Sequence, residues 1–83
     1  MEQRKPIQMK QGQLMLDEAK ETRQRVYVMA WDSKGNIIEY RGWLVSSSNW
    51  RGGWHRLLNP VSREIRTVPD IFIFNINGHQ IYL

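Results

Sequence analysis

Apolar residues alternate with polar ones, or run together in short blocks, along most of the chain after residue 25. Val26–Trp31 (VYVMAW) is apolar on both alternating faces, which is typical of a central strand covered on two sides. Residues 32–36 (DSKGN) predict a hairpin loop in which Gly35 adopts a positive φ, with Ile37–Val45 as the returning strand. Gly42 in the middle of that strand predicts a bulge or a sharp bend.

Beyond this hairpin the pattern predicts a loop and then a second hairpin. Residues 46–53 (SSSNWRGG) are polar, glycine or a lone tryptophan, and we expect them to form the loop. Trp54–Leu58 and Arg63–Val68 are the next two predicted strands, joined at Asn59-Pro60. Proline has no amide hydrogen to donate, so it fits a turn and cannot continue a central strand.

The clearest local signal is Asn77-Gly78, which lies between Ile71–Ile76 and His79–Leu83. Both central residues of a type I′ turn need a positive φ, and Asn-Gly is the usual pair that supplies them. The two-residue loop fixes the register and predicts these opposed pairs on the core face: Ile76 with His79, Phe74 with Ile81, and Phe72 with Leu83. The opposite face, which carries Ile73, is expected to be more exposed to solvent.

The first 25 residues have a weaker pattern. We expect residues 1–6 to form a flexible arm and residues 7–83 to form a single β-rich domain. Within 7–12, Ile7 and Met9 alternate with polar residues as in a short strand. Residues 14–25 (LMLDEAKETRQR) are good helix formers with an apolar cluster only at their start. A short helix and a strand that ends at Leu16 and is followed by a charged loop both fit this stretch.

Together these elements predict a mainly β domain with five or six short strands and one possible N-terminal helix. Closely spaced strands in a chain of 83 residues favour a small antiparallel barrel or a curled sheet. With a glycine in the second strand and an Asn-Gly hairpin last, the chain resembles SH3-like barrels and other small β folds in outline. A similarity at this level implies no function.

Composition narrows the possible functions. The chain has no cysteine, which excludes disulfides, thiolate zinc sites and a cysteine nucleophile. Its polar start does not resemble a signal peptide, and no apolar run is long enough to span a bilayer. We therefore expect a cytoplasmic protein without a membrane partner.

The net charge of +4 is unevenly distributed. In residues 40–83 the only acids are Glu64 and Asp70, and every basic residue is an arginine. These arginines are Arg41, Arg51, Arg56, Arg63 and Arg66. A cluster of one sign attracts anionic partners, and arginine suits planar or bidentate contacts. A net charge of this size is also common in small domains for solubility alone.

Titratable residues give no recognisable catalytic or metal-binding motif. The candidates for acid–base chemistry are Glu39, His55, Glu64, Asp70 and His79. Their spacing matches no known constellation, and two histidines without cysteine match no zinc site. We expect a protein that is not an enzyme and holds no metal or cofactor.

Residues 42–56 (GWLVSSSNWRGGWHR) combine three tryptophans with two arginines and a histidine. Large aromatic groups and positive charge on a loop suit binding. Trp43 and Trp54 fit strand positions and favour the core, whereas Trp50 has polar and glycine neighbours and is the better exposed anchor. The predicted binding residues are Arg41, Trp50, Arg51, Trp54, His55 and Arg56.

The sequence therefore predicts a small binding or assembly module whose aromatic and arginine-rich loop, residues 46–56, engages a protein partner. Tryptophan and arginine are enriched at interface hot spots. Self-association by edge pairing of the C-terminal strand is one form of this hypothesis. The alternative is a basic β-barrel that binds single-stranded nucleic acid without strong sequence preference.

Overall fold

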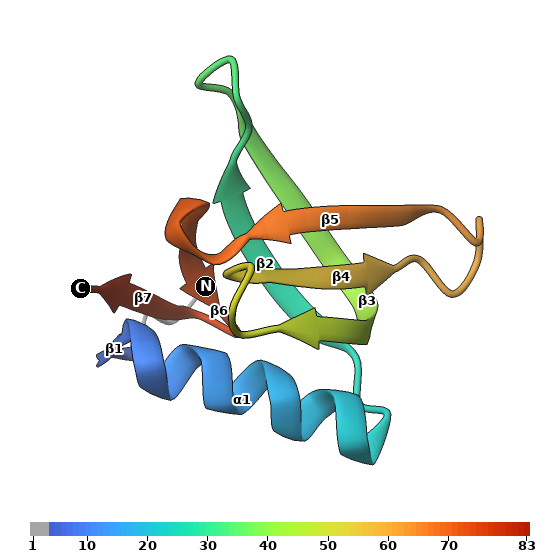
Figure 1. The fold of residues 1–83 in the computed structure, drawn as a ribbon, viewed down its shortest axis with the longest axis horizontal. Helices are drawn as coiled ribbons and strands as arrows, with labels where there is room; N and C mark the ends of the chain where they lie inside the picture. The colour runs from blue at the N-terminus through green and yellow to red at the C-terminus, as the bar shows by residue number, and fades with distance from the viewer. Residues whose placement is uncertain (1–3) are drawn as a thin grey trace.

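The computed structural model describes residues 4–83, which contain seven strands, one α-helix and a short 3-10 turn. In chain order the elements are β1 (Arg4–Gln8), α1 (Met9–Thr22), β2 (Val26–Trp31), β3 (Ile37–Asn49), β4 (Trp54–Leu58), β5 (Ile65–Pro69), the 3-10 turn η1 (Asp70–Phe72), β6 (Ile73–Ile76) and β7 (His79–Tyr82) (Figure 1). The prediction of a mainly β domain is confirmed.

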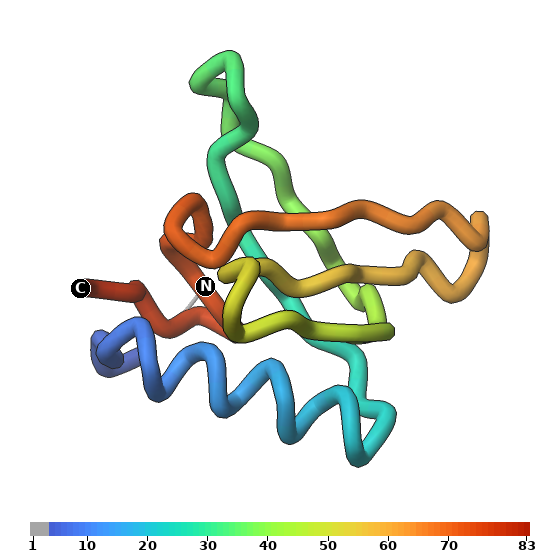
Figure 2. The backbone as a smooth tube through the Cα atoms, in the orientation of Figure 1, coloured from blue at the N-terminus to red at the C-terminus, as the bar shows by residue number. Residues whose placement is uncertain are grey.

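The strands form one mixed sheet in the order β1-β7-β6-β2-β3-β4-β5. Within residues 4–83, only the β1–β7 pair is parallel, and the terminal strands β1 and β5 do not pair to close a barrel. The long strand β3 pairs with β2 along its first part and with β4 along its second part. The sheet therefore changes direction at β3, and the β4–β5 hairpin points away from the β2–β3 hairpin (Figure 2). Of the two predicted alternatives, an antiparallel barrel and a curled sheet, the barrel is wrong because the sheet stays open. Over the described residues, the sheet is also mixed and has seven strands instead of five or six.

The first predicted hairpin is confirmed. β2 has the predicted bounds, and Gly35 in its loop has φ of 83°. Gly42 has φ of 68° and lies where the β2–β3 register shifts, as expected for a bulge. The bulge reverses the alternation, so Tyr40 and Val45 are both buried although simple alternation places them on opposite faces.

The predicted loop at residues 46–53 is too long. Ser46–Asn49 belong to β3, and Ser47, Ser48 and Asn49 lie opposite Arg56, His55 and Trp54 of β4. Backbone pairing does not require apolar side chains, so a polar run at a strand end resembles a loop in sequence. The strand β5 begins at Ile65 instead of Arg63, because Arg63 adopts a left-handed φ of 66° that interrupts an extended strand.

The C-terminal hairpin forms at Asn77-Gly78, with φ of 54° and 88°. The predicted pairing of Ile76 with His79 is confirmed, but Phe72 lies in η1, before β6 begins. The prediction that Ile73 lies on the more solvent-exposed face is wrong, because Ile73 is buried. A register shift between β6 and β2 brings both Ile73 and Ile76 to the core.

The predicted N-terminal arm lies partly inside the fold. Residues 1–3 are outside the described residues, whereas Arg4–Gln8 form β1 and pair with β7. The alternation within residues 7–12 indicated a short strand, but the strand lies earlier, and residues 9–12 belong to α1. Only Ile7 of β1 is buried, so the strand has little pattern of its own. A parallel partner from the far end of the chain supplies its hydrogen bonds.

Helix α1 confirms the helical alternative for the next stretch, and the strand ending at Leu16 is wrong. The helix begins at Met9, earlier than expected, and ends at a left-handed Arg23. Its buried residues, Gly12, Leu16 and Ala19, follow helical spacing. Gly12 permits close approach, because a Cβ at this position would lie 3.0 Å from Ile76 Cδ1.

The core lies on one side of β2, between β2, α1 and the β4–β5 hairpin. It contains Leu16, Ala19, Val26, Val28, Ala30, Tyr40, Val45, Leu57, Val68, Ile73 and Ile76. The other side of β2 carries Tyr27, Met29 and Trp31, which are half-buried or exposed. β2 is central in the sheet as predicted, but only one of its faces is fully covered. Among residues 4–83 there is no helix long and apolar enough to cross a membrane.

Candidate functional site

The predicted binding residues do not form one patch. Alternation along β4 points His55 into the core and leaves Arg56 exposed and Trp54 half-buried on the other face. Trp50 and Arg51 lie in the short turn that follows β3. Arg41 lies on the part of β3 that pairs with β2. The structure instead shows two clusters, one buried and one at the surface.

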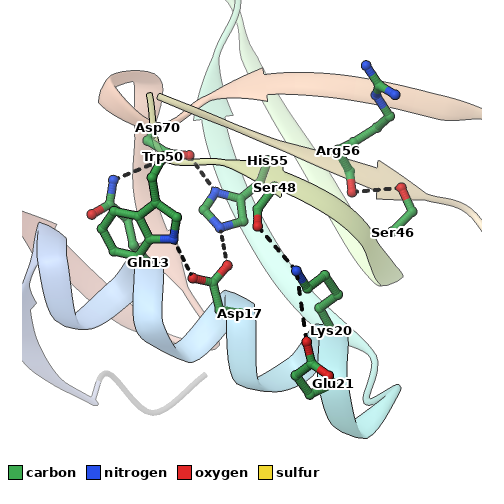
Figure 3. A network of polar contacts seen from close by, with 10 residues as sticks. All are labelled: Gln13, Asp17, Lys20, Glu21, Ser46, Ser48, Trp50, His55, Arg56 and Asp70. Atoms are coloured by element: carbon green, nitrogen blue, oxygen red, sulfur yellow. Dashed lines mark hydrogen bonds and ion pairs between the residues drawn. The ribbon is translucent and has the colours of Figure 1, made fainter. Parts of the chain in front are cut away.

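The buried cluster is centred on His55, of which only 2% is exposed. Its Nδ1 lies 2.6 Å from Asp70 Oδ1 in η1, and its Nε2 lies 3.0 Å from Asp17 Oδ1 in α1 (Figure 3). The second oxygen of Asp70 accepts a hydrogen bond from Gln13 Nε2 at 2.8 Å. The second oxygen of Asp17 accepts one from the indole of Trp50 at 2.9 Å. We call these five residues the histidine cluster.

Two carboxylates around one imidazole favour its protonated form, because a carboxylate accepts hydrogen bonds and only an imidazolium donates from both nitrogens. Burial by itself lowers the pKa of His55, but the hydrogen bonds and negative charges of Asp70 and Asp17 outweigh it. The net direction is upward from the ordinary value of 6.5. The geometry of the cluster therefore favours an imidazolium held between two carboxylates.

This arrangement joins three elements of the fold and leaves the imidazole of His55 poorly placed for acid–base catalysis. Both nitrogens of His55 are bound to carboxylates, so neither is free to take a proton from a substrate. The clamp holds α1, β4 and η1 together and also fixes the indole of Trp50. Across residues 4–83, no group of three or more acidic or histidine side chains could hold a metal ion.

Three of the five residues of the histidine cluster, His55, Asp70 and Trp50, are candidates in the sequence, whereas Asp17 and Gln13 are not. His55 and Asp70 were both candidates for acid–base chemistry, and the structure brings them into contact. Asp17 was missed, because it lies 38 positions from His55 in a charged stretch with no distinguishing pattern. Its position one turn after Gln13 on the same face of a helix was the only available signal.

The stability of the fold should fall as pH rises above neutrality. His55 has a raised pKa in the folded state, so its stabilising effect is complete below the unfolded value of about 6.5 and is lost as pH rises through the folded value. We expect the urea midpoint to be highest below about pH 6.5 and to decrease as pH rises through the folded pKa of His55. The variant His55→Gln should show a flatter profile, and a midpoint that rises over this range in the natural protein would contradict the prediction.

The surface cluster lies on the uncovered side of β2. Tyr27, Met29 and Trp31 point to this side, opposite Arg41, Glu39 and Ile37 of β3. Phe74 joins them from β6, with its ring centre 5.3 Å from that of Trp31. Trp31 is 43% exposed and Ile37 is 50% exposed. We call the surface formed by Tyr27, Met29, Trp31, Ile37, Glu39, Arg41 and Phe74 the outer face.

One end of the outer face opens into a hollow of about 500 Å³. We call it the arginine hollow, and its lining residues are Arg4, Arg25, Tyr27, Arg41 and Asn77. The guanidinium of Arg41 lies 5.4 Å from the ring centre of Tyr27, and its Nε donates to Glu39 at 2.8 Å. Among residues 4–83, Arg4 and Arg25 form no ion pair with an acid. The hollow therefore carries an excess of positive charge beside an aromatic ring.

Distant segments build this hollow. β1 pairs with β7, which brings Arg4 against Gly78 of the last turn: a Cβ on this glycine would lie 3.6 Å from Arg4 Cγ. In that same turn, Asn77 Oδ1 accepts a hydrogen bond from the backbone N–H of Tyr27 at 2.9 Å. Only Arg41 was predicted as a binding residue, because the sequence shows no link between residues 4, 25 and 41.

The remaining predicted residues lie around the turn between β3 and β4. Trp50 is 52% exposed although its N–H is bound to Asp17. The guanidinium of Arg56 stacks 4.8 Å from the ring centre of Trp54. Gly52 packs on that indole so closely that a Cβ would lie 2.5 Å from Trp54 Nε1. Trp54 is thus a half-buried residue on the surface side of β4.

Trp43 has the predicted core role. It packs against the core cluster and meets Tyr40 edge to face, with ring centres 5.0 Å apart. The sequence favoured the core for both Trp43 and Trp54. Only Trp43 packs against the core, because Trp54 lies on the face of β4 that points away from it.

Comparison with protein-family models, with curated proteins and with solved structures gives no match for this chain. Its function is therefore argued from its own residues.

Proposed function

We propose that this protein is a non-enzymatic binding module whose ligand is a nucleic acid, held through its phosphates by the arginine hollow. The observation that carries the proposal is the convergence of Arg4, Arg25 and Arg41 on one hollow beside Tyr27. Three separate segments supply these arginines, so the concentration of charge is a property of the fold and is not a basic run in the sequence.

The chemistry of the hollow suits phosphate. A guanidinium offers a planar set of donors that matches phosphate oxygens in pairs, and it stays charged at any physiological pH. Glu39 offsets part of the charge of Arg41, which leaves Arg4 and Arg25 to make the strongest contacts. Phosphate contacts supply most of the non-specific affinity of nucleic-acid-binding proteins. The modest net charge of +4 is compatible with this role because the charge is local.

The proposal is tested by fluorescence anisotropy with a labelled mixed-sequence DNA oligonucleotide between about 50 and 200 mM salt. We expect affinity to fall steeply with salt, and Arg25→Ala or Arg4→Ala to weaken binding and reduce the salt slope by about 1 each. Lys10→Ala removes the same charge from the exposed surface of α1 and serves as the control. Binding that ignores salt, or equal losses for Arg25→Ala and Lys10→Ala, would contradict the proposal.

A protein partner that docks at residues 46–56 is the second candidate. It is favoured by the half-exposed indole of Trp50, which the hydrogen bond to Asp17 holds in one position. A pre-positioned aromatic group loses little entropy on binding. Pairing through the C-terminal strand is no longer part of this candidate, because β7 lies between β1 and β6 and has no free edge. In the anisotropy experiment, absence of DNA binding would favour the protein partner, whereas loss of DNA binding on Arg51→Ala with unchanged binding by Arg25→Ala would move the nucleic-acid contact to residues 46–56.

A further inference from the structure

We infer that the outer face is a stacking platform for unpaired bases, so that the nucleic acid held by the arginine hollow is single-stranded. This inference rests on the proposed function and adds the form of the ligand to it. The arginine hollow and the outer face are continuous, because Tyr27 and Arg41 belong to both.

Strand β2 sets the spacing of the platform. Tyr27, Met29 and Trp31 occupy every second position, so neighbouring side chains are about 6.6 Å apart and the row is about 13 Å long. The row begins in the arginine hollow and ends at an exposed indole. Each nucleotide of a nucleic acid carries an anionic phosphate and a planar aromatic base. The row on β2 offers a basic end for the phosphate and an aromatic end for the base.

The indole of Trp31 is supported but not covered. The ring of Phe74 lies against it at an interplanar angle of 38°, and Ile37 lies opposite on β3. These contacts hold Trp31 in place, and 43% of its surface stays open to solvent. The core on the other side of β2 contains Val26, Val28 and Ala30, and the aromatic side chains of the outer face are not part of it.

Charge along the outer face orients the ligand. The guanidinium groups of Arg4, Arg25 and Arg41 gather at the arginine hollow, and Glu39 in the middle of the face is paired with Arg41. The other end of the face presents the aromatic and apolar side chains of Trp31, Phe74 and Ile37. The arginine hollow therefore takes phosphate, and the aromatic end takes bases. A duplex keeps the faces of its bases stacked inside and cannot use that end.

The experiment compares three DNA ligands of equal length: a mixed-sequence single strand, its duplex, and a single strand of abasic sites. We expect the single strand to bind more tightly than either of the others. Trp31→Ala should weaken its binding by about 5- to 150-fold, the range for one lost stacking contact. Binding should also quench part of the tryptophan fluorescence in the natural protein, and this part should be missing in Trp31→Ala.

Two further variants make the result specific. Trp31→Phe keeps an aromatic ring beside Phe74 and should retain most of the affinity, which separates stacking from loss of fold. Leu14→Ala removes an apolar side chain of similar exposure (53%) from α1 and should leave affinity unchanged.

The outcomes separate this inference from the proposed function. If Arg25→Ala weakens binding but Trp31→Ala does not, and duplex binds as tightly as single strand, the proposed function stands and the stacking platform is wrong. If none of the three DNA ligands binds, both are wrong, and the outer face is then open to a protein partner instead.

Discussion

Replacing His55 by alanine should lower the free energy of unfolding by about 3–5 kcal/mol, the usual cost of removing one partner from a buried ion pair. The substitution leaves Asp70, which is only 3% exposed, with the single donor Gln13. It also leaves Asp17 and Asp70 without the positive charge that separates them. Since a small domain has about 5–15 kcal/mol of total stability, this loss is a large share of it.

Urea unfolding at pH 6.5 measures the effect. The other histidine provides the control: His79 is less buried, its Nδ1 contacts the carbonyl oxygen of Lys5, and His79→Ala should cost less than about 1 kcal/mol. Asp17→Asn should give an intermediate loss, because the side chain of Asp17 is 22% exposed and Asp70 still holds the imidazolium. If His55→Ala unfolds at nearly the same urea concentration as the natural protein, the cluster is not a clamp.

Leu16→Ala should be the second severe change, with a loss of about 2–5 kcal/mol. Leu16 is 1% exposed and is the largest buried side chain that α1 contributes to the core. A 14-residue helix is marginally stable by itself, so it depends on this contact with the sheet. Weakening it also loosens the attachment of Gln13 and Asp17 to the histidine cluster.

The same helix supplies the matched control for this prediction. Leu14 is 53% exposed, and Leu14→Ala makes the same chemical change with an expected effect below about 0.5 kcal/mol. Thermal unfolding followed by circular dichroism measures both variants. Equal melting temperatures for the two would show that α1 does not depend on its buried face.

Sequence pattern predicted those elements whose signals are local. β2 and β4 have the expected bounds because their apolar and aromatic residues form compact runs between turn residues. The turn at Asn77-Gly78 and the bulge at Gly42 follow from the positive φ that each position adopts. Ser46–Asn49 and Arg4–Gln8 were not recognised as strands, because their pairing depends on distant partners.

The candidate sites were much less predictable than the fold. His55, Asp70 and Arg41 were singled out by residue type, but nothing in the chain tells which of them is buried. The inward direction of His55 follows from its register against β3 and β5, and the bulge between Val45 and Ser47 sets that register. A shift of one position would turn the imidazole to the opposite face.

By itself, then, the sequence determined the local geometry of this protein: where the strands with compact apolar runs lie, where the chain turns, and which positions need glycine or asparagine. Those features depend on neighbouring residues and on backbone sterics. Only the tertiary structure decided that Asp17 and Asp70 meet at His55, and that Arg4, Arg25 and Arg41 meet beside Tyr27. Such clusters depend on strand order, on register and on the β1–β7 pairing, which join residues that no local pattern connects.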